Sequence, residues 1–253
     1  MKDKNFNGLI IRVITLIILI LYVLFLYMDR YSVKTVITSE YIKYLCIILC
    51  FLLSILPTKK LLVGFGIGKD LHAYTANYRD RVLLRLGMFI TIIADLCLVI
   101  FDFYILGVVS FCMVQIIYSV RYDPKKQKIT LISFFITFQC IVLSYFIVRL
   151  FIKEINILLP IALFYSICLL TSVIKSIKAF KSNLYSSPNK YMILFGMILF
   201  LLCDICVALS NITVILPITA HFIISLKQIA LFLIWVFYLP SQLLLALSGS
   251  NEI

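Results

Sequence analysis

The sequence predicts an all-α fold, a polytopic membrane bundle of eight transmembrane helices that forms a single domain over residues 1–253. Its residues are 64% hydrophobic and 13% charged, whereas soluble domains average about half apolar and about a quarter charged. Eight long apolar runs follow one another, and each approaches the roughly 20 residues that cross a hydrocarbon core about 30 Å thick. The remainder suffices only for short loops, which excludes a water-soluble globule and a separate soluble catalytic domain.

The apolar runs end at charged residues, at Pro or at clusters of Asn, and each is expected to form one helix. The first run is too long for the hydrophobic part of a signal peptide, so it is expected to remain as an anchor. The segment 211–225, which contains Pro217, is compatible with a re-entrant or interfacial piece. The expected helices span residues 9–28, 41–57, 83–101, 103–120, 130–150, 157–177, 190–210 and 226–248.

The net charge of +12 would indicate nucleic-acid binding in a soluble protein, but in a membrane bundle the placement of Lys and Arg sets orientation. Counted on alternate sides of the expected helices, fourteen lie on one face, against Arg30, Lys34 and Lys153 on the other. Because cytoplasmic loops carry such an excess, both termini are predicted to lie in the cytoplasm. The expected location is the plasma membrane of a bacterium. The expected partner is therefore the lipid bilayer and not nucleic acid.

The longest predicted loop, residues 58–82, contains the glycine-rich stretch GFGIGKD from Gly64 to Asp70. Such a stretch resembles a phosphate-binding loop only superficially, because no strand precedes it. We interpret the loop as a flexible basic linker on the cytoplasmic surface. Four basic and aromatic side chains of this loop are expected to rest on anionic lipid headgroups: Tyr74, Tyr78, Arg79 and Arg81.

Two carboxylates interrupt apolar helices, Asp95 in TIIADLCLVI and Asp204 in LFLLCDICVAL. An ionised carboxylate inside a bilayer costs at least a few kcal/mol, so such residues are candidates for function. At 1.5 Å per residue they lie about 18 and about 21 Å from the cytoplasmic ends of their helices, and therefore at a shared depth. Two carboxyls in one low-dielectric cavity do not both ionise cheaply, so one is expected to be a general acid and the other a general base.

The segments around the two aspartates are alike, with a Gly-Met pair before each and a Cys two residues after each, at an offset of 109 residues. This predicts a parallel pseudo-repeat of four plus four helices whose axis brings the aspartates face to face. Polar residues at helical spacing follow each aspartate, Gln115 and Tyr118 after the first and Tyr238 and Gln242 after the second. The alternative is that these groups only hydrogen-bond helices together.

Lys43 near the outer end of the second helix is either a counter-ion for one of the carboxylates or a side chain that reaches the interface. No cofactor is expected. The two histidines, His72 and His221, cannot supply a three-histidine zinc site, so no metal site is expected either.

Four stretches together resemble the YhhN-like lysoplasmalogenase family: GMFITIIADLCLV, LGVVSFCMVQIIY, GMILFLLCDICVALSN and WVFYLPSQLLLALS. That family comprises eight-helix membrane enzymes that cleave the vinyl ether bond of lysoplasmalogens to a fatty aldehyde and a glycerophospho-alcohol. Its motifs match this chain from the second to the eighth helix. The matching positions are Lys43, Asp95, Phe111, Tyr118, Asp204, Tyr238 and Gln242.

The chain departs from the family pattern at three positions. Ala94 stands for the Gly before the first Asp, and Cys203 stands for the Ser before the second, both exchanges of one small residue for another. Gln115 occupies the position of the family's His, which replaces a titratable group with a neutral hydrogen-bonding one.

The resemblance implies a membrane hydrolase in lipid metabolism, with a lysophospholipid as substrate. In the mechanism we expect, one of Asp95 and Asp204 protonates the vinyl ether while the other stabilises the cation and orients water. Lys43, Gln115, Tyr118, Tyr238 and Gln242 would position the polar end of the substrate. The alternatives are a lipid or small-solute transporter or binding protein with an inactive enzyme-like site, and an intramembrane aspartyl protease. The oligomeric state does not follow from the sequence.

Overall fold

The computed structural model describes residues 2–31, 38–56, 70–152, 156–215 and 221–249, which form helices and the turns that join them, with no strand. All eight expected helices are present there. They are α1 (Lys2–Tyr31), α2 (Ser39–Ile55), α3 (Asp70–Asp95), α4 (Tyr104–Arg121), α5 (Gln127–Phe151), α6 (Leu158–Lys181), α7 (Asn189–Ile215) and α8 (His221–Leu247). The predicted all-α fold is therefore confirmed.

Seven of these described helices are long and apolar enough to cross a membrane. The exception is α2, whose 17 residues make it about 26 Å long at 1.5 Å per residue, slightly shorter than a hydrocarbon core of about 30 Å. Helices suit this composition because lipid offers no hydrogen bonds, so every backbone group must be satisfied within its own segment. The chain is a multi-pass membrane protein.

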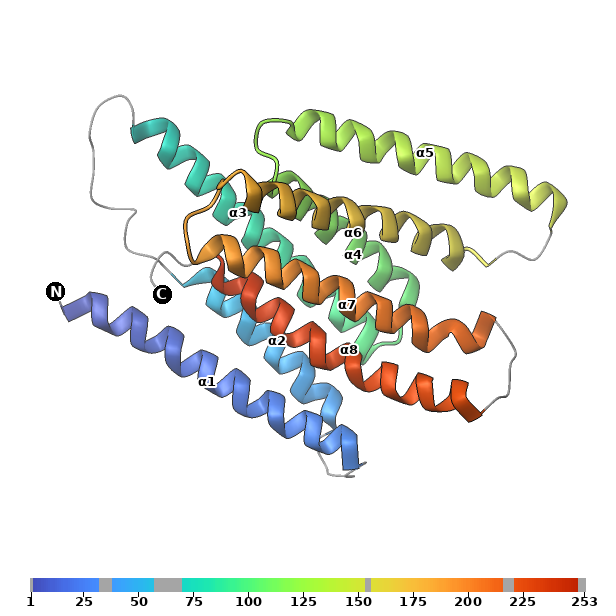
Figure 1. Ribbon diagram of the computed structural model, residues 1–253, viewed down its shortest axis with the longest axis horizontal. Coiled ribbons are helices and arrows are strands. Elements are labelled where there is room, and N and C mark those ends of the chain that lie inside the picture. Colours follow the sequence, from blue (N-terminus) through green and yellow to red (C-terminus); the bar gives the residue numbers. More distant parts are fainter. Residues whose placement is uncertain (1, 32–37, 57–69, 153–155, 216–220, 250–253) are drawn as a thin grey trace. The chain divides into compact units, whose positions relative to one another are not determined.

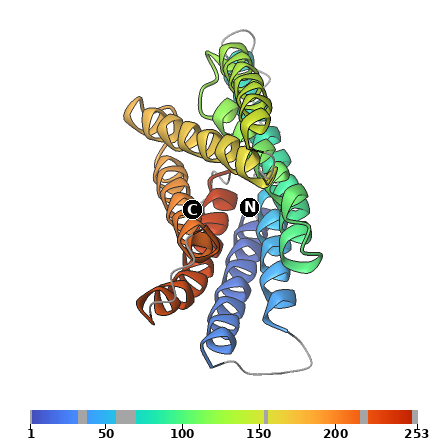
Figure 2. The ribbon, with the colours of Figure 1, turned by 90° about the vertical axis from the view of Figure 1, so that its right-hand side faces the viewer.

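The chain divides into two compact units, Met1–Leu61 with Ser186–Ile253, and Leu62–Tyr185. In the first unit, α8 contacts α1, α2 and α7, and α7 runs beside α8 in both views (Figures 1 and 2). In the second unit, α4 contacts α3, α5 and α6. This grouping differs from the predicted halves of four consecutive helices, because the first two helices pack with the last two.

The basic linker predicted over residues 58–82 is wrong for its second part, since α3 begins at Asp70. The hydropathy pattern detects only the apolar portion of this helix, whereas the polar portion is held by side-chain bonds from Asp80 to Arg121 and from Arg79 to Gln127. Of the glycine-rich stretch Gly64–Asp70, only Asp70 is among the described residues. The interpretation of 211–225 as a separate piece is also wrong where it is described, because α7 continues to Ile215 and α8 begins at His221.

A π-helical turn, Leu96–Ile100, replaces α-helix directly after Asp95. The Phe101 N–H donates to the Leu96 carbonyl at 3.1 Å, five residues back instead of four. Such turns occur mostly within helices and often at functional sites. In this chain the turn packs against α4, where a Cβ on Gly107 would lie 2.3 Å from Leu98 Cγ.

Pro240 lies inside α8 without ending the helix. Because proline has no N–H, the carbonyl of Val236, four residues earlier, loses its helical donor. The hydroxyl of Tyr22 on α1 donates to that carbonyl at 3.0 Å. A neighbouring helix thus supplies the missing hydrogen bond, which is how proline is tolerated in membrane helices.

We predict that Tyr22→Phe lowers the unfolding free energy by about 1–3 kcal/mol, because it leaves the Val236 carbonyl without its donor. Thermal unfolding in detergent measures the change, and Tyr27→Phe, at an exposed position of the same helix, is the control. In a Pro240→Ala background the helical N–H returns, so Tyr22→Phe should then have little effect. An equal loss in both backgrounds would contradict the assignment.

Candidate active site

Asp95 is the last residue of α3 and is 3% exposed. Two close contacts set the register of α3 against α4: Gly87 lies against Tyr118, and Leu98 lies against Gly107. Since the two helices run in opposite directions along the chain, Asp95 lies level with the part of α4 around Phe111. The structure therefore places this carboxyl in the interior of its unit, at the junction with the π-helical turn.

Gly87 matters because of the space that it leaves. A Cβ at this position would lie 2.6 Å from Tyr118 Cε1, which is closer than real Cβ contacts allow. The Tyr118 ring is fully buried in that space, and its hydroxyl donates to Met88 Sδ at 3.3 Å. The absence of a side chain on α3 thus sets the position of the tyrosine on α4.

Gln115 is fully buried one turn before Tyr118 on α4. Its Oε1 accepts a hydrogen bond of 2.6 Å from Ser172 on α6. Its Nε2 has no hydrogen-bond partner among the described residues. The amide oxygen of Gln115 therefore takes part in a hydrogen bond between two helices, whereas its two N–H donors are unused among the described residues.

The second aspartate, Asp204, is half-buried on α7 between the buried Cys203 and Cys206. The register of α7 against α8 follows from two contacts, the Ser241 hydroxyl donating to the Gly196 carbonyl at 2.8 Å and the rings of Phe200 and Tyr238 5.8 Å apart. One turn beyond Phe200, Asp204 lies level with the part of α8 around Trp235.

Tyr238 and Gln242 lie one turn apart on the buried face of α8, 5% and 0% exposed. The Tyr238 ring contacts Phe200 and Trp235 edge to face. In the part of the chain that the structure describes, neither the amide nitrogen nor the amide oxygen of Gln242 has a hydrogen-bond partner. A fully buried, unpaired amide is costly, so it indicates a place where a bound molecule or water supplies the partner.

Lys43 is 8% exposed, and its ammonium pairs with Asp29 at 2.8 Å. The ammonium also lies 5.1 Å from the centre of the Trp235 ring and 5.8 Å from that of Phe25. The structure thus gives Lys43 a carboxylate partner, but it is Asp29 at the end of α1, which the sequence analysis did not consider. A usable signal was present, since Asp29 and Lys43 occupy the joined ends of two consecutive helices.

The predicted site residues are divided between the two units. Asp95, Gln115 and Tyr118 belong to the second unit, and Lys43, Asp204, Tyr238 and Gln242 belong to the first. Among the residues that the structure describes, no three His, Cys, Asp or Glu side chains are placed to hold a metal ion. The side chains of His72 and His221 lie outside the described set.

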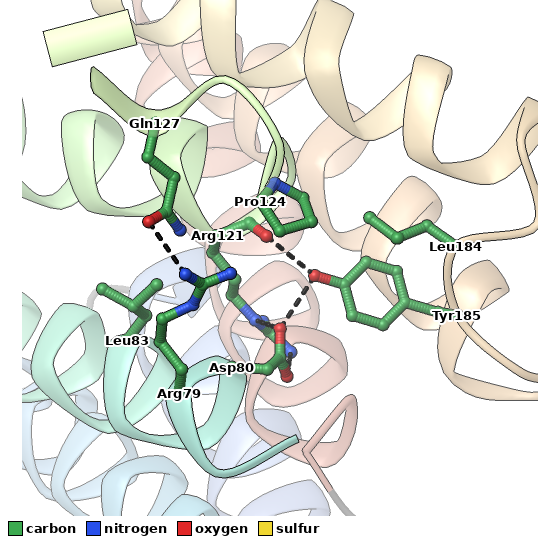
Figure 3. Close-up of a pocket in the computed structure, with 8 residues that line it drawn as sticks. All are labelled: Arg79, Asp80, Leu83, Arg121, Pro124, Gln127, Leu184 and Tyr185. Carbon is green, nitrogen blue, oxygen red and sulfur yellow. Dashed lines mark hydrogen bonds and ion pairs between the residues drawn. The ribbon is translucent and has the colours of Figure 1, made fainter. Parts of the chain in front are cut away.

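A polar network that the sequence analysis missed joins α3, α4 and the connection between α6 and α7 (Figure 3). Arg121, 2% exposed, holds both carboxylate oxygens of Asp80 at 2.9 and 3.0 Å. The hydroxyl of Tyr185 donates to the same carboxylate at 2.8 Å and to the Arg121 carbonyl at 3.1 Å. Burial raises the pKa of Tyr185, and the Asp80 charge raises it further, so the phenol keeps its proton and remains a donor.

These features define a class: a multi-pass helical membrane protein in which carboxyl, amide and phenol groups are enclosed within helices that are otherwise apolar. The chain belongs to the YhhN family, which it matches over residues 9–249. The predicted family membership is thus confirmed over nearly the whole sequence. No curated protein and no solved structure matches the chain.

We predict that Asp29→Asn and Lys43→Gln each lower stability, and that together they lower it by less than their sum. The reason is that either single change leaves a partly buried charge without its partner. A double-mutant cycle from unfolding in detergent should give a coupling of about 1 kcal/mol or more.

The control for this cycle is Glu40→Gln, which removes an exposed negative charge from the same end of α2. Glu40→Gln combined with Lys43→Gln should be additive within about 0.5 kcal/mol. Equal coupling of Lys43 to Asp29 and to Glu40 would show a general charge effect and not a specific pair.

Proposed function

We propose that this protein is a membrane hydrolase that cleaves the vinyl ether bond of lysoplasmalogens, with Asp95 and Asp204 as its acid and base. Membership of the YhhN family over residues 9–249 is the observation that carries the proposal. The burial of Asp95 and the unpaired amide of Gln242 support it, because an enclosed acid and an unused buried amide suit a site for an amphiphilic ligand.

In the proposed reaction, one carboxyl group protonates the carbon of the double bond that is remote from the ether oxygen. The resulting oxocarbenium ion is stabilised by the other, ionised carboxylate, and water adds to its positive carbon. The hemiacetal then loses the glycerol oxygen as an alcohol, which gives one aldehyde and one glycerophospho-alcohol for each water consumed. The proton returns to a carboxylate, so no other reactant is needed.

Lys43, Gln115, Tyr118, Tyr238 and Gln242 are proposed to position the substrate. The amide of Gln242 and the Nε2 of Gln115 are suited to hydrogen-bond its glycerol and headgroup oxygens. The aromatic side chains Trp235, Tyr238 and Phe200 form an apolar wall within the first unit. The Lys43 ammonium pairs with Asp29 beside this wall, and its remaining N–H donors are proposed to reach an oxygen of the substrate's headgroup.

The proposed location is a bacterial plasma membrane. On the distribution of Lys and Arg, the proposed orientation keeps both termini in the cytoplasm. It requires α2 to cross the bilayer although it has only 17 residues. A short helix is accommodated by local thinning of the bilayer or by flanking side chains that reach the interface.

The direct test is release of fatty aldehyde from a lysoplasmalogen by the purified protein in detergent. We expect Asp95→Asn and Asp204→Asn each to lower kcat by about 100-fold or more, since a neutral amide neither donates the proton nor stabilises the cation. The matched control is Asp102→Asn, because Asp102 is exposed and has a φ of 56°, which asparagine adopts as readily. Full activity of either aspartate variant would remove that residue from the mechanism.

A second prediction separates binding from stability at Gln242. Gln242→Leu replaces an unpaired buried amide with an apolar group of similar size, so the free energy of unfolding should stay the same or rise by about 1–3 kcal/mol. The KM for lysoplasmalogen should rise at the same time. Ser241→Ala provides the contrast, because Ser241 has a partner in the Gly196 carbonyl and its loss should destabilise. A loss of stability in Gln242→Leu would show a purely structural role.

A further inference from the structure

A pocket of about 110 Å³ opens beside the network of Asp80, Arg121 and Tyr185, and Arg79 and Gln127 also line it (Figure 3). All of these residues belong to one compact unit. A cavity of this volume has room for several waters or one small polar group. None of the residues proposed to catalyse or bind lysoplasmalogen takes part in it.

The charges around this pocket leave one cation in excess. Arg121 and Asp80 neutralise each other through their two-point contact, and Tyr185 adds a neutral donor to the carboxylate. Arg79 is exposed, and the hydrogen bond that the structure gives its side chain runs from Nη1 to Gln127 Oε1 at 3.1 Å. A guanidinium carries five N–H donors, so Arg79 retains donors for a further ligand.

Gln127 holds the Arg79 side chain at the pocket. Its own Nε2 donates to the Val120 carbonyl at 3.3 Å, and this bond orients its oxygen toward Arg79. Figure 3 shows the Arg79 guanidinium between Gln127 and the Arg121–Asp80 pair, all of which line the pocket. The cation is therefore preorganised, which lowers the entropy lost when a ligand binds.

We infer that this pocket binds a phosphate group through the Arg79 guanidinium, whose planar fork matches two phosphate oxygens at once. Arg79, Asp80 and Arg81 precede the apolar part of α3, so the pocket lies at the polar end of that helix, where headgroups and dissolved ions both have access. The group is therefore either the phosphate of an anionic phospholipid or free phosphate, and the chemistry of recognition is the same.

This site is separate from the proposed catalytic one. Asp95 lies 15 residues after Asp80 on the same helix, which is about 22 Å at 1.5 Å per residue. The phosphate and the vinyl ether of a lysoplasmalogen are attached to the same glycerol, so one substrate molecule does not reach both places. Phosphate binding here would be an additional property, and it is measurable without catalysis.

The test is calorimetric titration of the purified protein in an uncharged detergent with three probes: inorganic phosphate, dihexanoyl phosphatidic acid and dihexanoylglycerol. We expect saturable binding of at least one phosphate-bearing probe and none of dihexanoylglycerol. Binding of both phosphate probes would show that the phosphate group is sufficient for recognition. Binding of only one would show whether the ligand is free phosphate or the phosphate of a phospholipid. No saturable binding of either, or equal binding of dihexanoylglycerol, overturns the inference.

Variants assign the binding to the pocket. Arg79→Gln should raise the dissociation constant of the phosphate probe that binds by about tenfold or more, because a charge-assisted hydrogen bond is lost. Lys128→Gln removes an exposed positive charge beside Gln127 without altering the pocket lining, and should weaken binding by no more than about twofold. Equal weakening by both variants would mean a diffuse charge effect and would overturn the assignment. Unfolding temperatures confirm that each variant is folded.

Discussion

The close packing within each unit depends on glycines that admit a side chain from a neighbouring helix. Gly87 admits Tyr118, and Gly196 admits Leu245, whose Cγ would lie 2.9 Å from an added Cβ. Lipid tails are as apolar as the side chains themselves, so membrane helices associate through close packing and not through the hydrophobic effect. These contacts let α3 approach α4 and α7 approach α8, and that approach buries the polar groups between them.

Buried polar groups then need hydrogen-bond partners within the protein, because the hydrocarbon core of the bilayer supplies none. Two backbone carbonyls of α7 and α8 have side-chain partners: the Val236 carbonyl has Tyr22, and the Gly196 carbonyl has Ser241. The amide of Gln242 differs from these carbonyls, since its side chain is fully buried and both of its polar atoms are unpaired among the described residues. Among the described residues, the packing of α8 therefore leaves an amide without the hydrogen bonds that buried polar groups normally have.

The positions of the helices follow from the sequence because a long apolar run in lipid has almost no alternative to helix. The same argument does not reach the polar first half of α3, where helix depends on Asp80 meeting Arg121 and Tyr185, 41 and 105 residues away in the chain. Nor does it reach the π-helical turn after Asp95, which depends on packing against α4. The polar residues of the candidate site were recognisable by type and spacing, whereas their partners, Asp29 for Lys43 and Ser172 for Gln115, come from other helices and require the fold.

The two copies of the sequence repeat belong to different units: α3 and α4 to the second unit, and α7 and α8 to the first. Tyr118 and Leu245, which meet the two glycines, each come three residues after a fully buried glutamine, so α3 with α4 and α7 with α8 share one packing register. Different helices pack against each pair, and they determine whether the buried glutamine has a hydrogen-bond partner. In the second unit α6 provides Ser172, which binds Gln115. In the first unit, α1 and α2 instead provide Asp29 and Lys43, and Gln242 keeps both amide atoms unpaired. Of the two buried glutamines, the one in the first unit therefore keeps the larger unmet hydrogen-bonding capacity among the described residues.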